Sequence, residues 1–118
     1  GNAGLATAYA GRRLGLPVTV VLPTTTPAFV QDRLRAYGAE PVVHGSVWDE
    51  ANEYAMDLAE DVLGVLIHPF DHPDLFEGHA SLVAEVREQL LEEGQDEPPG
   101  AFVTVVGGGG LLRGILRG

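Results

Sequence analysis

Four consecutive glycines, Gly107 to Gly110, offer the clearest chemistry in this chain of 118 residues. Because glycine has no side chain, successive backbone N–H groups in such a run can turn toward one anion and surround it. A strand-like run at residues 102–106 precedes the glycines, and a helix-like run at residues 111–116 follows them. This order places the glycines at a helix N-terminus, where the helix dipole favours negative charge. We therefore predict a phosphate-binding loop.

Two common phosphate-binding motifs do not fit this loop. A Walker loop requires a lysine after its last glycine, but the 7 basic residues of the chain are all arginine. The dinucleotide fingerprint Gly-x-Gly-x-x-Gly fails in both registers, because Leu112 and Arg113 stand where its third glycine belongs. A structural alternative stays open, in which the glycines only permit a tight turn between a strand and a helix.

Asn2 stands at the start of a helix that we predict over residues 3–14. Its side-chain oxygen is suited to cap this helix by accepting a backbone N–H. A helix N-terminus also attracts an anionic ligand or a polarised ring oxygen. A capping role and a ligand role are compatible, and the local sequence favours neither.

The histidines suggest two further sites, and each has an ordinary structural alternative. His68 and His72 have the spacing of a metal-binding pair on a helix, but Pro69 between them opposes a helix. His79 and Ser81 have a spacing compatible with a catalytic pair, although no Gly-x-Ser-x-Gly elbow accompanies them. Capping and solvation at a helix start account for the same residues. We predict no metal site.

Hydrophobic periodicity predicts helices and strands in strict alternation. The expected helices span residues 3–14, 27–37, 47–62 and 76–92, and a last one starts at residue 111. The expected strands span residues 18–22, 41–44, 64–67 and 102–106, and a capping box is expected from Ser46 to Asp49. Short connections between alternating elements indicate an α/β fold, with open parallel sheets and helices on both faces. Ligands of such sheets bind at the carboxyl ends of strands, where the glycine loop lies.

Composition restricts the possible partners and compartments. The chain is 45% hydrophobic, which suffices for one modest core or for parts of two domains. A net charge of −10 argues against nucleic acid and against an anionic membrane as partners. The absence of cysteine excludes disulfides, thiolate zinc sites and a cysteine nucleophile. No apolar run approaches the roughly 18 residues of a membrane span, and no signal peptide is visible, so a cytoplasmic location is the default expectation.

Several segments resemble the fold-type II pyridoxal-phosphate enzymes, the group that includes the β subunit of tryptophan synthase. The start Gly1-Asn2-Ala3-Gly4 and the run at residues 22–27 are similar to the small domain of that group. The runs at residues 68–71 (His-Pro-Phe-Asp), 77–81 (Glu-Gly-His-Ala-Ser) and 106–111 (Val-Gly-Gly-Gly-Gly-Leu) more narrowly resemble the L-serine dehydratase and L-threonine deaminase branch. The resemblance implies that residues 1–67 belong to the small domain and that residues 68–118 begin the large one.

The resemblance also implies roles for individual residues. Asn2 is expected to hydrogen-bond the ring hydroxyl oxygen of pyridoxal 5'-phosphate, and Phe70 to line the substrate side of the pocket. The phosphate is expected to be held by Gly107, Gly108, Gly109, Gly110 and Leu111. No catalytic residue falls in the chain, because the Schiff-base lysine of the family is absent from it. We expect an internal piece of a longer protein, inactive by itself.

The activity implied for the complete protein is β-elimination from small amino acids. L-Serine loses its hydroxyl to give aminoacrylate, which hydrolyses to pyruvate and ammonia, and L-threonine gives 2-oxobutyrate. The complete protein is expected to be a homodimer. Alternatives are an O-acetylserine-dependent cysteine synthase or a threonine synthase, whose phosphate loops are richer in threonine, and a non-catalytic ligand-binding relative.

Overall fold

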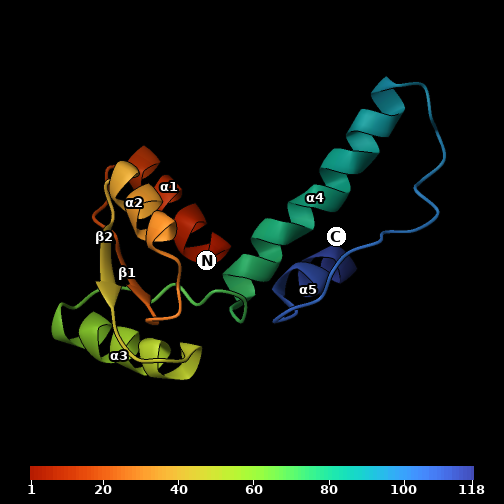
Figure 1. The fold of residues 1–118 in the computed structure, drawn as a ribbon. Helices are drawn as coiled ribbons and strands as arrows, with labels where there is room; N and C mark the ends of the chain where they lie inside the picture. Colours follow the sequence, from red (N-terminus) through yellow and green to blue (C-terminus); the bar gives the residue numbers. More distant parts are fainter. The chain divides into compact units, whose positions relative to one another are not determined.

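The computed structural model describes residues 1–118 as two compact units, Gly1–Ile67 and His68–Gly118 (Figure 1). The first unit contains α1 (Asn2–Leu14), β1 (Thr19–Leu22), α2 (Ala28–Ala36), β2 (Glu40–Val43) and α3 (Trp48–Asp61). The second unit contains α4 (Pro73–Glu92) and α5 (Gly110–Arg117). No helix of either unit is long and apolar enough to cross a membrane.

The first unit is built around a parallel pair of strands. β1 and β2 lie in register, with Val20 opposite Pro41 and Leu22 opposite Val43. On one face, side chains of β1 join those of α1 and α2 in a buried cluster of Ala8, Val20, Leu22, Val30, Leu34 and Ala39. Side chains alternate between the two faces of a strand. α3 contacts β1 and lies on the side of the strand pair away from α1 and α2 (Figure 1). This arrangement confirms the α/β fold with parallel strands and helices on both faces.

The helix ends of the first unit agree with local sequence signals, except that one capping contact is displaced by one residue. Gly15 ends α1 in the left-handed conformation (φ 68°), and its N–H donates to the carbonyl of Arg12. The capping box predicted from Ser46 to Asp49 uses Glu50 instead, because α3 starts at Trp48 and the third helical residue is Glu50. The backbone N–H and the hydroxyl of Ser46 both donate to its carboxylate. These bonds, the backbone one foremost, hold the pKa of Glu50 below its ordinary value of 4.5.

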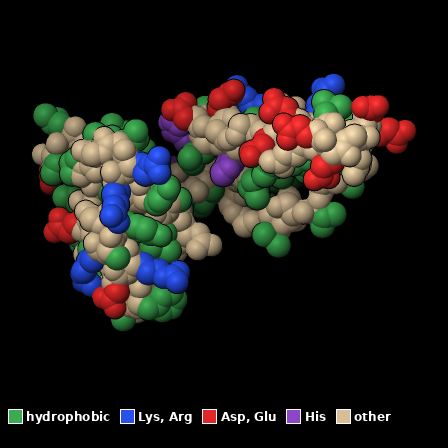
Figure 2. Space-filling view, turned by 90° about the horizontal axis from the view of Figure 1, so that it is seen from above, with side chains coloured by type: hydrophobic (Ala, Val, Ile, Leu, Met, Phe, Trp, Pro, Cys, Tyr) green, Lys and Arg blue, Asp and Glu red, His purple; other side chains and the backbone are tan.

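The second unit consists of two packed helices and the long segment between them. α4 begins at Pro73, with proline at its first position, and His72 caps it by accepting the N–H of Asp74 at Nδ1 (3.2 Å). α5 lies beside the N-terminal part of α4 (Figure 1). Acidic side chains spread over the surface of this unit (Figure 2), and on α4 the exposed ones include Glu85, Glu88 and Glu92.

Two of the four predicted strands are wrong. Residues 64–67 and 102–106 form neither helix nor strand, and Val103 and Val105 are 98% and 88% exposed. Their β-branched composition is typical of strands, but a strand exists only when its backbone bonds a neighbour. In residues 1–118 the only paired strands are β1 and β2. The glycine loop therefore follows an irregular segment.

Candidate functional site

The glycine run forms a turn with one packed side and one open side. Gly109 is the N-cap of α5 and has φ 86°, a conformation that glycine adopts freely and other residues rarely do. A Cβ at Gly108 would strike the ring of Phe70, and one at Gly110 would lie 2.6 Å from the Phe70 carbonyl oxygen. A Cβ at Gly107 or Gly109 would meet nothing within 4 Å. The loop thus rests on Phe70 and leaves its other side free for a ligand.

A hollow of about 250 Å³ lies beside this turn. Its lining includes Pro69, Phe70, His79, Val105, Val106, Gly107, Gly108, Gly109, Gly110, Leu111 and Leu112. The structure thereby brings together the four glycines, Leu111 and Phe70, all of which the sequence had singled out. Phe70 forms the support of the loop, and its role toward a substrate stays a prediction.

Backbone donors and charge at the start of α5 suit an anion. The N–H of Arg113 donates to the carbonyl of Gly109 (3.0 Å) and closes the first turn. The amides of Gly110, Leu111 and Leu112 precede this donor, and amides at that place in a helix have no partner within it. The first turn of α5 carries no acidic residue. The helix dipole and these amides therefore favour negative charge at the loop.

Four contacts hold α5 against residues 71–79, at the start of α4. Arg113 donates from Nη1 to Asp71 Oδ1 (2.8 Å), and its guanidinium carbon lies 4.6 Å from the centre of the Phe76 ring. Arg117 forms an ion pair with Glu77 (2.6 Å). Gly114 packs directly on His79, because a Cβ there would collide with the His79 Cβ. The position of the glycine loop thus depends on this helix contact.

His68, His72 and Ser81 bond the backbone in this structure. His68 accepts at Nδ1 the N–H groups of Phe70 (3.3 Å) and Asp71 (2.9 Å), while His72 caps α4. The residues form no group of three or more His, Cys, Asp or Glu side chains that could hold a metal. The hydroxyl of Ser81 donates to the carbonyl of Gly78 (2.8 Å), as expected for the structural alternative to a catalytic pair.

Asn2 belongs to the first unit, and of the two roles left open for it the structure excludes the capping role. Gly1 is the N-cap of α1, and Asn2 is the first helical residue with no side-chain capping bond. The carbonyl of Gly1 accepts the N–H of Leu5 (3.2 Å), so the helix begins one residue earlier than its composition indicates. The Asn2 side chain is exposed and is not used by the helix. Its role as a ligand stays a prediction.

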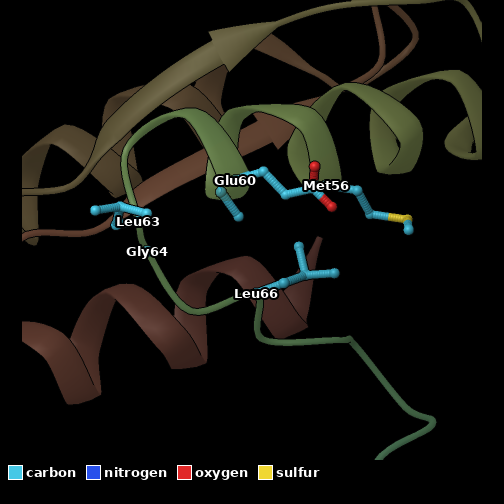
Figure 3. A pocket seen from close by; sticks show the side chains of 6 residues that line it. Met56, Glu60, Leu63, Gly64 and Leu66 are labelled. Carbon is cyan, nitrogen blue, oxygen red and sulfur yellow. The ribbon is translucent and has the colours of Figure 1, made fainter.

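A larger hollow of about 560 Å³ lies in the first unit, beside α3 (Figure 3). Its lining is Met56, Ala59, Glu60, Leu63, Gly64 and Leu66. Figure 3 shows Met56 and Glu60 on α3 and Leu66 on the segment that follows it. The one ionisable group here is the Glu60 carboxylate, which repels anions. The smaller hollow at the glycine loop is therefore the better candidate for an anionic ligand, despite its size.

A protein-family model described as "Pyridoxal-phosphate dependent enzyme" matches residues 1–118. The chain belongs to this family. It is 53% identical over its full length to a Mus musculus protein named serine dehydratase-like, of which it covers 34%. It is also 52% identical to L-serine dehydratase/L-threonine deaminase of Rattus norvegicus, covering all of this chain and 31% of that protein. The chain spans about a third of the length of these curated relatives.

A solved structure of a related enzyme has a similar fold. The fungal L-serine ammonia-lyase from Rhizomucor miehei superimposes with a TM-score of 0.82 at 32% sequence identity. The match covers 95% of this chain and 34% of that one. The family is pyridoxal-phosphate dependent, and the geometry of the glycine loop suits a phosphate group. The open side of Gly107 and Gly109 and the free amides of α5 supply space and donors for it.

The sequence alone did not indicate the residues that support this loop. Two ion pairs support it, Arg113 with Asp71 and Arg117 with Glu77. The residues of the Arg113–Asp71 pair are 42 positions apart in the sequence. No local spacing predicts a partner so distant. One signal was available: glycine recurs at every fourth position from Gly110 through Gly114 to Gly118. That pattern places glycine along one face of a helix and indicates a close neighbour on that face.

Proposed function

We propose that the protein containing this chain is a pyridoxal-phosphate dependent L-serine dehydratase that also accepts L-threonine. The observation that carries the proposal is the sequence identity of about one half to a protein named serine dehydratase-like and to one named L-serine dehydratase/L-threonine deaminase. It extends over the whole chain. Threonine-rich phosphate loops are typical of the alternative synthases, and this chain has leucine after its glycines.

Each predicted site residue has a task in this proposal. The backbone amides of Gly107, Gly108, Gly109, Gly110 and Leu111 hold the cofactor phosphate. Asn2 hydrogen-bonds the ring hydroxyl oxygen, and Phe70 lines the substrate side while its backbone supports the loop. The bound cofactor supplies an electron sink that makes the substrate α-proton removable. Fixed amides at the phosphate hold the cofactor ring in one position, so that the ring stays oriented toward the substrate during the reaction.

The lysine that the proposed reaction requires lies outside residues 1–118, because this chain contains no lysine. The chain alone is therefore expected to be inactive. Incubation with pyridoxal phosphate followed by borohydride should leave no mass increase on any of its side chains. A reduced adduct on a side chain, located by peptide mass spectrometry, would contradict this part of the proposal.

The decisive assay offers L-serine, L-threonine, or O-acetylserine with sulfide to the full-length protein. Hydroxide is a poor leaving group, so its loss requires a proton donor near the fixed cofactor. We expect pyruvate from serine and 2-oxobutyrate from threonine. Cysteine as the dominant product would overturn the assignment in favour of a synthase. D-Serine without pyruvate would mean that the proton returns to the α-carbon, and absence of any product with cofactor bound would favour the non-catalytic relative.

Asn2→Ala tests the cofactor contact separately from the fold. The variant should lower turnover through the lost ring-oxygen contact, with an unchanged melting temperature, because the side chain makes no capping bond. Asn52→Ala, an asparagine near the start of α3, is the matched control and should leave turnover unchanged. Equal turnover of Asn2→Ala and the unmodified protein would remove Asn2 from the site.

Three further parts of the proposal concern domains, assembly and location. The first two come from the family resemblance, and the cytoplasmic location is the default expectation from the sequence. Residues 1–67 are assigned to the small domain and residues 68–118 to the large one. The protein is a homodimer located in the cytoplasm. Light scattering coupled to size-exclusion chromatography gives the mass of the assembly, and a monomer or tetramer would contradict the homodimer.

A further inference from the structure

We propose that Asp71 is a positioning residue for the cofactor phosphate, acting through Arg113 on the start of α5. This inference rests on the proposed role of the glycine loop in holding that phosphate. Asp71 is not expected to touch the cofactor. Its carboxylate instead fixes the helix turn from which the phosphate-binding amides project.

Arg113 connects Asp71 to the loop by two bonds. Its guanidinium donates to Asp71 Oδ1 (2.8 Å), and its backbone N–H donates to the Gly109 carbonyl (3.0 Å). The guanidinium also lies over the Phe76 ring, with 4.6 Å to the ring centre. Side chain and backbone of one residue therefore join the segment before α4 to the N-cap of α5.

The segment that carries Asp71 is itself held in place. His68 accepts the backbone N–H groups of Phe70 and Asp71 at one ring nitrogen. Phe70 supports Gly108 with its ring and Gly110 with its backbone. The run at residues 68–71 thus contacts the glycine loop through Phe70 and the first turn of α5 through Asp71. Both contacts fix the same backbone amides.

Because the ion pair is exposed, its loss should affect the position of the loop more than the free energy of unfolding. The side chains of Arg113 and Asp71 are 59% and 62% exposed, and exposed pairs contribute little to the free energy of unfolding. Loss of the Asp71 carboxylate should therefore leave the protein folded while the α5 turn becomes less well fixed. Preorganised donors lose affinity when the groups that orient them are removed.

The sign of the effect separates positioning from charge. Asp71 places a negative group beside a site for an anion, so by charge alone its removal should strengthen phosphate binding. Positioning predicts the opposite, because a loosened turn presents its amides less well. Weaker binding after neutralisation of Asp71 therefore cannot come from charge.

The experiment measures dissociation constants of pyridoxal phosphate and of pyridoxal, which lacks the phosphate, on the full-length protein. We expect Asp71→Asn to weaken pyridoxal phosphate binding by about fivefold, as for loss of one modest ion pair, and to leave pyridoxal binding unchanged. Asp32→Asn is the matched control, because Asp32 pairs with Arg35 at 3.1 Å on the surface of the first unit. It should change neither constant.

The double variant tests whether Asp71 acts through Arg113. Asp71→Asn combined with Arg113→Gln should bind pyridoxal phosphate no more weakly than Arg113→Gln alone. Arg113→Gln also serves as the second test of the pair if Asp71→Asn does not fold. Unchanged or tighter binding by either single variant, or an equal loss for pyridoxal and its phosphate, would overturn the inference. Failure of the unmodified protein to prefer the phosphate form would overturn the proposed loop function and this inference together.

Discussion

Residues 1–67 bury a cluster of apolar side chains around β1, whereas in residues 68–118 the only buried residues are two glycines. The first unit contains all of the buried hydrophobic side chains, with Leu34 at 0% exposure. In the second unit Gly110 and Gly114 are buried, and α4 buries no residue. Its helices are held by close contact at these glycines, and two exposed ion pairs add local contacts between α5 and residues 71–77. The glycine loop is thus held by a few specific contacts and not by a hydrophobic core.

This difference separates two kinds of sensitivity to mutation. Each buried side chain of a core contacts many others, so truncation of one of them lowers the free energy of unfolding. A unit held by close backbone approach is sensitive to the addition of single atoms instead. Loss of buried side chains in the first unit should therefore lower the free energy of unfolding, and added atoms in the second unit should disturb the close helix contact or the glycine loop.

Truncation of the core should give the largest effect. Leu34→Ala removes a fully buried side chain of α2 and should lower the free energy of unfolding by about 3 kcal/mol. Leu91→Ala, on α4, removes the same atoms from a side chain that is 49% exposed and should cost less than about 1 kcal/mol. Urea unfolding of both variants measures the contrast. Equal losses would mean that the two units are stabilised alike.

Addition of one methyl group between α4 and α5 should come next. Gly114→Ala places a Cβ against His79 and should destabilise the helix contact by about 2 kcal/mol. Gly78→Ala is the matched control within α4, since a Cβ there meets nothing within 4 Å. Alanine forms helix better than glycine, so this control should be stabilised by about 0.5–1 kcal/mol. Thermal unfolding that shows the same sign for both variants would contradict the close contact.

Substitution within the loop should affect ligand binding more than folding. Gly109→Val forces a β-branched residue into φ 86° and fills the open side of the turn. The full-length protein should lose more than about tenfold in affinity for pyridoxal phosphate, or about 1.4 kcal/mol. Gly107→Ala, which adds only a Cβ in open space, should change affinity less. An unchanged dissociation constant for Gly109→Val would mean that the loop is only a structural turn.

The smallest expected effect is a pH dependence at the start of α3. The pKa of Glu50 in the folded chain lies below its ordinary value of 4.5, because the Ser46 N–H and hydroxyl bond its charged form. The contact therefore stabilises the helix start fully above that pH and is lost as the pH falls through the lower, folded value. NMR titration of the Ser46 amide should report a midpoint below 4.5. Glu50→Gln should abolish the transition, while Glu53→Gln should leave it in place.

The sequence predicts elements well where the signal is local. Every predicted helix forms, and Gly15 and Gly38 follow the ends of α1 and α2 with positive φ, as is typical of glycine after a helix. The strands at residues 19–22 and 40–43 also form, because each finds the other as a neighbour. Residues 102–106 carry an equally strong strand pattern but pair with nothing in the chain. Strand formation depends on a partner, and composition does not identify that partner.

The candidate site divides in the same way. The glycines and Phe70 were predicted from motifs, and the structure brings them to one hollow. The Asp71 to Arg113 pair was not predicted, because it depends on how α4 and α5 pack. Asn2 does not cap α1, because Gly1 is the N-cap and Asn2 is already the first helical residue.

The recurrence of glycine in α5 has a consequence for the order in which the second unit acquires its structure. Each internal glycine lowers helix propensity by about 1 kcal/mol relative to alanine, and a helix of 8 residues is too short to persist alone in water. α5 should therefore be helical only while it is seated on α4. In hydrogen exchange, the amides of α5 should exchange whenever α5 detaches from α4, and therefore much faster than the amides of β1. A phosphate bound at the loop would close this opening and slow exchange along the whole helix.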